Sequence, residues 1–109
     1  MATKKAQIQS DLEAFIKRQK KLRAAIRFHK NDIFLTAIAE GADVNKIPDE
    51  GETNLNTAIL SDNWWAFNEL LNRGVDIRQR GGAGLEPLIV AASVLNEPMV
   101  EALLKRIRA

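Results

Sequence analysis

The chain has 109 residues, 46% of them hydrophobic, and a formal net charge of +2, which is the size and composition of one domain with a single core. Cysteine and tyrosine are absent and His29 is the only histidine, so disulfides, thiolate metal sites and histidine metal clusters are excluded, and we expect no cofactor and no enzyme activity. No apolar run approaches the roughly 20 residues needed to span a bilayer, and the N-terminal residues lack the apolar stretch of a secretory signal, so we expect a cytoplasmic protein without a membrane partner.

The first segment of the chain is basic and amphipathic. Residues 1–30 carry nine Lys or Arg against two acidic residues, a charge of +7, whereas residues 31–109 carry seven against twelve, a charge of −5. Apolar residues recur mostly at helical spacing and predict a helix of about 20 residues with a break near residues 17–19; they are Ile8, Leu12, Phe15, Ile16, Leu22 and Ile26. Ser10 and Glu13 match a capping box at which this helix could start, although it could equally extend back through Ala6 and Gln7.

The remainder of the chain repeats with a period of 33 residues. The stretch GADVN at residues 41–45 returns as GVDIR at residues 74–78, and the same offset relates Leu55 to Leu88 and Ala58 to Ala91. Such self-similarity predicts a stacked repeat array, in which each unit buries its apolar face only against its neighbours and no enclosed cavity forms. The period also reaches back to residues 22–26. We therefore expect a divergent repeat over residues 18–45 and further repeats over 46–78 and 79–109, with residues 1–17 as a basic N-terminal helix that caps the stack.

Each unit is predicted to contain two short helices and an extended connection. In the middle unit, residues 55–59 mark an inner helix and residues 64–71 an outer helix. Asn63 and Asn96 are suited to capping the outer helices, and Pro98 is tolerated in a first helical turn. Gly74 stands where a left-handed residue commonly ends a helix. The segments NKIPDEG and IRQRGGAG are too rich in Gly, Pro and charge to continue as helix.

These residues resemble the ankyrin repeat over about residues 18–108. The matching positions include Gly51, Thr53 and Leu55 in the middle repeat, and Gly84, Pro87, Leu88, Ala91, Leu103 and Leu104 in the last. Four positions depart from the family pattern: Asn54 stands in place of Pro, Glu86 in place of Thr, and Asn56 and Ile89 in place of His. These departures put the tightness of individual turns in doubt. The resemblance implies an all-α ankyrin-repeat α-solenoid with an extra N-terminal helix, and a non-catalytic protein-binding module.

A concave face is expected to contact the partner protein. On the repeat register it carries Phe28, Ile47, Asp49, Glu50, Glu52, Leu60, Ser61, Arg80, Leu85, Ser93 and Val94. By the same register Trp64 is buried and Trp65 is exposed, so Trp65 is a further candidate anchor. The alternative is that the apolar members pack on neighbouring turns and that Trp65 covers an adjacent repeat, because scattered surface apolar residues are normal.

The sequence also suggests two other partners, a second copy of the chain and a nucleic acid. The C-terminal repeat has no polar capping repeat after it, which favours self-association of the chain there unless its basic residues supply enough polarity. A basic surface at Lys17, Arg18, Lys20, Lys21, Arg23 and Arg27 suggests phosphate contacts of a nucleic-acid-associated protein, but the acidic remainder of the chain argues against them. We expect a small adaptor or inhibitor, of the kind made by bacteria and their viruses, that blocks or scaffolds a target protein.

Overall fold

The structure, a computed structural model, describes residues 3–109 and contains six helices in that range. They are α1 (Thr3–Arg27), α2 (Asn31–Ala39), α3 (Asn54–Leu60), α4 (Trp64–Asn72), α5 (Pro87–Ser93) and α6 (Glu97–Arg108). Residues 3–109 contain no strand. The predicted all-α class is therefore confirmed.

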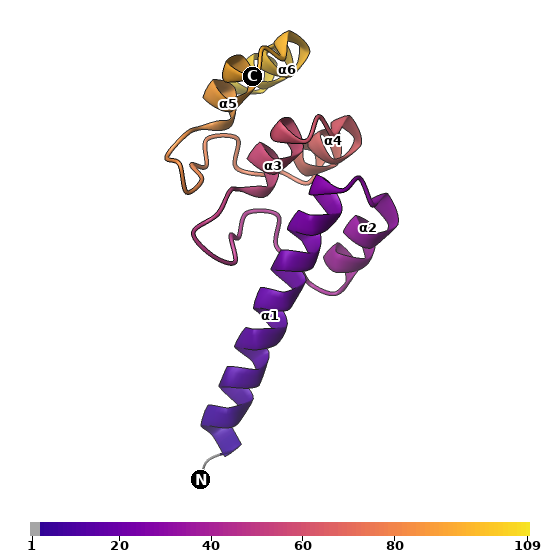
Figure 1. Cartoon of the computed structure of the whole chain (residues 1–109), viewed down its shortest axis with the longest axis vertical. Coiled ribbons are helices and arrows are strands. Elements are labelled where there is room, and N and C mark those ends of the chain that lie inside the picture. Colours follow the sequence, from indigo (N-terminus) through magenta and orange to yellow (C-terminus); the bar gives the residue numbers. More distant parts are fainter. Residues whose placement is uncertain (1–2) are drawn as a thin grey trace.

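The helices form three helix–turn–helix pairs that follow one another along the molecule, which measures 55 × 28 × 24 Å (Figure 1). The helices of each pair contact one another, and α3 packs against both α1 and α5. Hydrogen bonds also join neighbouring pairs. The side-chain amide of Asn63 donates to the Ile26 carbonyl at 2.8 Å, and that of Asn56 donates to the Leu85 carbonyl at 3.1 Å. Each pair is thus held by the pair beside it, as in a repeat stack.

The 33-residue period of the sequence reappears in the backbone. The short turn inside each pair contains one non-glycine residue with positive φ: His29 at 57°, Asp62 at 50° and Leu95 at 57°. Gly41 and Gly74, which follow the outer helices α2 and α4, have φ of 102° and 75°. The left-handed conformation predicted for Gly74 is confirmed, and the three pairs share one local geometry.

The predicted caps of the outer helices are also confirmed. The side chain of Asn63 accepts a hydrogen bond from the Ala66 N–H at 3.0 Å, and that of Asn96 accepts one from the Met99 N–H at 3.1 Å. Pro98 lies in the first turn of α6. These caps fix where the outer helices begin, while the repeat boundaries at residues 17/18, 45/46 and 78/79 stay predictions.

The N-terminal helix differs from the prediction in length and position. α1 is unbroken from Thr3 to Arg27, so the predicted break near residues 17–19 is wrong. Of the two predicted starts, the longer helix that includes Ala6 and Gln7 is confirmed and the start at Ser10 is not. Residues 3–14 are exposed and extend away from the helix pairs, at the end of the molecule opposite α6 (Figure 1). They continue the first inner helix, and the capping role of residues 1–17 stays a prediction. Residues 1 and 2 of the predicted capping helix lie outside the described residues.

A buried glutamine joins α1 to the loop over residues 40–53. Gln19 is fully buried, and its side-chain amide donates to the carbonyls of Asp43 and Lys46, both at 2.8 Å. Its side-chain oxygen accepts a hydrogen bond from the Asp43 N–H at 2.6 Å. All the polar atoms of this side chain are therefore paired with backbone, which offsets the cost of burying them.

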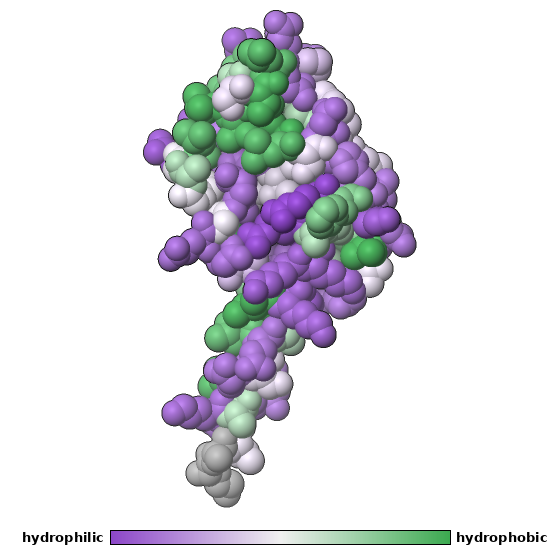
Figure 2. Space-filling model, in the orientation of Figure 1, coloured by the Kyte–Doolittle hydropathy of each residue, from purple (hydrophilic) through white to green (hydrophobic). Residues whose placement is uncertain are grey.

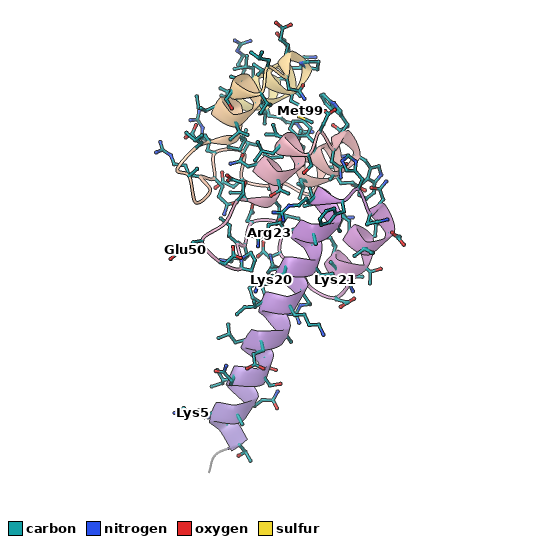
Figure 3. The ribbon with its side chains drawn as sticks, viewed as in Figure 1. Lys5, Lys20, Lys21, Arg23, Glu50 and Met99 are labelled. Carbon is teal, nitrogen blue, oxygen red and sulfur yellow. The ribbon has the colours of Figure 1, made fainter. Side chains whose placement is uncertain are left out.

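The core runs through the three pairs as one continuous cluster. Phe34 and Phe67 are its largest side chains, and Met99, labelled in Figure 3, joins it from α6. Its other members are Leu22, Ala25, Ile26, Ala37, Leu55, Ala58, Ile59, Ala66, Leu70, Leu71, Val75, Val90, Ala91 and Leu103. Most of these positions recur at the repeat period, as the stacked arrangement requires.

Candidate protein-interaction surface

The residues predicted to bind a partner lie on several parts of the surface. Among the apolar ones, Phe28, Leu60, Leu85 and Val94 are 63%, 56%, 41% and 44% exposed. The polar Asp49, Glu50, Arg80 and Ser93 are exposed, and Ile47, Glu52, Ser61 and Trp65 are half-buried. Seven of these twelve residues line one of three hollows, and the role of the set in partner binding stays a prediction.

The first hollow lies between the turns of the second and third pairs. Its volume is about 320 Å³, and its lining includes Leu60, Asp62, Val94 and Leu95. We call Leu60, Val94 and Leu95 the turn patch. The structure thus brings two predicted residues, Leu60 and Val94, together with a third that the sequence analysis did not select.

Leu95 is the most unusual residue of the turn patch. It is 86% exposed and has a φ of 57°, a conformation that costs an L-residue with a bulky side chain about 1–2 kcal/mol. The equivalent turn residues are the polar His29 and Asp62. The 33-residue offset from Asp62 was the signal that could have identified Leu95 before the structure was known.

The second hollow lies between the two long loops, over residues 40–53 and 73–86. It has a volume of about 400 Å³, and Ile47, Asp49, Glu50 and Arg80 are among its lining residues. Glu50 lies on the loop that extends away from the helices (Figure 3). The predicted polar residues of the loop tips therefore do lie together.

Glycine allows the two loops to approach each other. The Gly82 N–H donates to the Gly51 carbonyl at 3.0 Å. A Cβ atom at Gly82 would overlap the Glu50 carbonyl, and one at Gly81 would overlap the Glu52 carboxylate. The shape of this hollow depends on the absence of side chains at Gly81 and Gly82.

An ion pair supports the first loop from α1. Arg23 donates from Nη1 and Nη2 to the two carboxylate oxygens of Asp49, at 2.7 and 2.8 Å. The Gly51 N–H also donates to Asp49 Oδ1 at 2.8 Å. The hydrogen bonds from Arg23 and Gly51 hold the pKa of Asp49 well below its usual range, and the Asp49 carboxylate raises the pKa of Arg23. Asp49 therefore orders the loop as well as contributing charge to its surface.

Phe28 lies apart from the other predicted apolar residues. It lines a third hollow of about 260 Å³ with Ala24 and Ile33, beside Lys21 and Lys30. This hollow is formed by α1, α2 and the turn between them. Phe28 is thus exposed as predicted but does not join the turn patch.

The two tryptophans differ from the prediction. Trp64 is 36% exposed and packs edge-on to Phe67 at 5.4 Å between ring centroids, so its predicted burial was wrong. Trp64 is the first residue of α4, and because helical side chains lean toward the N-terminus, no preceding turn of α4 covers it. Trp65 is half-buried and meets Phe34 of α2 at 5.1 Å. It covers the adjacent pair, as the alternative interpretation held, and its role in partner binding stays a prediction.

The predicted basic surface is partly used within the fold. Arg23 pairs with Asp49, and Lys21 pairs with Glu40 at 2.7 Å. Arg18 is half-buried and stacks over Phe15. Lys17, Lys20 and Arg27 are exposed. The exposed charge available to phosphates is thus smaller than the sequence indicated, and nucleic-acid binding by these residues stays a prediction.

Membrane-spanning helices and metal-binding clusters are both absent from residues 3–109. None of the helices in this range combines the length and apolar character needed to cross a membrane. In the same range no three His, Asp or Glu side chains gather where they could hold a metal ion.

The chain is similar to Notch proteins over 84 residues. It is 37% identical there to the neurogenic locus Notch protein of Drosophila melanogaster, 34% identical to the neurogenic locus notch homolog protein 1 of Mus musculus, and 33% identical to that of Homo sapiens. The matched segment is 76% of this chain but only 3% of each Notch protein. No protein-family model matches the chain.

The similarity to Notch supports the expectation that this chain is a protein-interaction module. The matched region of Notch contains ankyrin repeats, and the match is consistent with such repeats in this chain. Together with the all-helical stack, it suggests a non-enzymatic protein-interaction module.

Proposed function

We propose that the chain is an ankyrin-repeat domain that binds a target protein through the turn patch and thereby blocks or scaffolds that target. The observation that carries this proposal is the exposure of Leu95 in a left-handed turn beside Leu60 and Val94. A polar residue would be better solvated there and less strained. Selection for binding accounts for an apolar side chain at this position.

The turn patch has enough apolar surface to anchor a partner. Full burial of one exposed leucine contributes about 1.5–3 kcal/mol, and Leu60, Val94 and Leu95 are 56%, 44% and 86% exposed. Their combined burial is therefore worth roughly 3–6 kcal/mol before the costs of association. The charged loop tips with Glu50 and Arg80 would then orient the partner, since charged rims contribute mainly to specificity and association rate.

The proposal includes where and how the module acts. A small module of this kind acts in the cytoplasm as an adaptor or inhibitor, with a bacterial or phage origin. It acts by occupying its target, because the residues described above are suited to contact and not to chemistry.

The substitution Leu95→Asn tests the proposal. Asparagine tolerates the left-handed conformation, so we expect the variant to be as stable as the parent or up to about 1 kcal/mol more stable. Binding to the target should weaken at least about tenfold, since a central apolar anchor is lost. Thermal unfolding measures the first effect, and titration of the captured target measures the second.

The target is first obtained by affinity capture on the 109-residue chain, with mass spectrometry at moderate and at high salt. Leu12→Asn is a matched control, because Leu12 is also exposed but lies on the projecting part of α1. A protein that survives high salt, is retained by Leu12→Asn and is lost by Leu95→Asn supports the proposal. Equal retention by both variants contradicts it, as does recovery of nucleic acid alone that disappears at high salt.

A further inference from the structure

The third helix pair exposes a surface that the middle pair buries. On α3, Asn56 and Ile59 are 0% and 2% exposed, and α5 packs against that helix. One period later on α5, Ile89 is 51% exposed and Ala92 is also exposed. Where Asn56 donates a hydrogen bond to the neighbouring repeat, Ile89 presents only hydrocarbon. This end of the stack therefore has the composition of an interface between repeats.

Helix α6 extends the same surface. Val100 and Leu104 are half-buried on α6, and a hollow of about 600 Å³ has Ala92, Val100, Glu97 and Glu101 among its lining residues. We call Leu88, Ile89, Ala92, Val100 and Leu104 the end face. Figure 2 shows apolar residues gathered over the part of the molecule formed by α5 and α6. Such clustered apolar surface is typical of interaction sites.

The charges beside the end face are ordered along α6. Glu97 and Glu101 stand in its first half and Lys105 and Arg108 in its second, all exposed. Their spacing of four, four and three residues places them along one side of the helix. If two α6 helices meet antiparallel, Glu97 of each lies opposite Arg108 of the other. The pattern is thus complementary to itself, as an interface around a two-fold axis requires.

We propose that two copies of the chain pair through their end faces about a two-fold axis, with their α6 helices antiparallel. The pair buries Ile89, Val100 and Leu104 and places the acidic and basic halves of α6 against each other. The opposite end of the molecule carries the projecting part of α1 (Figure 1), so it does not offer the same flat surface for head-to-tail stacking. The assembly is therefore a closed dimer. Leu95 of the turn patch also lines the hollow of about 600 Å³, so the two proposed surfaces adjoin, but the dimer rests on the end face alone.

Two variants with equally exposed side chains locate the contact. Ile89 and Leu12 are each 51% exposed, so replacing either with aspartate adds similar polarity to the folded chain. In sedimentation equilibrium across a wide concentration range, we expect a dimer for the parent chain and for Leu12→Asp, and a monomer for Ile89→Asp. A parent chain that stays monomeric throughout overturns the proposal. So does a dimer that Leu12→Asp dissociates and Ile89→Asp leaves intact.

Charge reversal tests the antiparallel arrangement. Acidic residues early and basic residues late in a helix also favour the helix itself, through its dipole. We expect Glu97→Arg and Arg108→Glu each to weaken the dimer about tenfold, because each change introduces two repulsive contacts per dimer. The double variant should recover the parent dissociation constant to within about threefold, although it opposes the dipole. A double variant that dimerises more weakly than either single variant would overturn the proposal.

Discussion

The buried side chain of Gln19 offers the sharpest test of how the first loop is held to α1. Replacement by methionine keeps the volume of the side chain but removes its three hydrogen bonds to backbone, at 2.6, 2.8 and 2.8 Å. Each such bond contributes about 1 kcal/mol net. We therefore expect Gln19→Met to lower the free energy of unfolding by about 3 kcal/mol.

The assay is urea denaturation followed by circular dichroism, together with thermal unfolding. For a chain of 109 residues, a loss of about 3 kcal/mol corresponds to a fall in Tm of roughly 10–15 °C, given an unfolding entropy of about 2.1 cal/mol/K per residue. The matched control is Gln9→Met. Gln9 lies on the same helix and donates only to the exposed Glu13, so its loss should change stability by less than about 0.5 kcal/mol.

A loss below about 1 kcal/mol for Gln19→Met would refute the reasoning. It would mean that water replaces the amide at the Asp43 and Lys46 backbone groups, so that the loop needs no protein partner there. Gln19→Glu adds a second check, because a carboxylate would face the two carbonyl oxygens that the amide now contacts. We expect Gln19→Glu to be less stable than Gln19→Met at neutral pH.

Two more predictions concern the loops. Gly82→Ala should destabilise the fold by about 1–3 kcal/mol, since its Cβ would overlap the Glu50 backbone carbonyl, which cannot rotate away like a side chain. Asp49→Asn should lower the midpoint of urea unfolding at neutral pH by removing the pair with Arg23. Because pairing lowers the pKa of folded Asp49, its contribution is present in full above the unfolded pKa of about 3.9 and is lost progressively as the pH falls from there toward the lowered pKa of the folded chain. The difference in urea midpoint between the two chains should therefore shrink steadily below that pH.

Gly84 and Glu40 provide the controls for these two predictions. A Cβ atom at Gly84 meets no other atom within 4 Å, and the cost of Gly84→Ala comes only from its φ of 78°. A Gly82→Ala variant that loses no more stability than Gly84→Ala would contradict a specific overlap at Gly82. Glu40→Gln removes an exposed ion pair whose carboxylate lacks the extra backbone bond of Asp49. If it shows the same dependence on pH as Asp49→Asn, the lowered pKa of Asp49 is not the cause.

The sequence predicted the features that depend on local chemistry and periodicity. The 33-residue offset identified the inner and outer helices, and Asn63 and Asn96 identified where the outer helices start. These succeed because a cap or a left-handed glycine acts within a few residues. The turn geometry shared by His29, Asp62 and Leu95 follows from the same offset.

Other features depend on what lies next to a residue in space. Trp64 follows the buried register, yet it stands at the first position of α4 and is partly exposed. A break was predicted near residues 17–19, whereas Gln19 is buried in an unbroken α1 and its side-chain amide is paired with the loop backbone. Helical spacing alone predicts neither how much of Trp64 is exposed nor which groups form hydrogen bonds with Gln19.

The hydrogen bonds that cross between helix pairs in residues 3–109 join only adjacent pairs, as from Asn63 to Ile26 and from Asn56 to Leu85. Cooperativity in such a molecule is transmitted step by step, like that of a short one-dimensional lattice. The terminal unit with Leu95 then has one stabilising neighbour, and it can loosen while the first two units keep their shape. A partner that binds this unit would slow amide hydrogen exchange there most strongly. The slowing would become smaller in each unit toward α1.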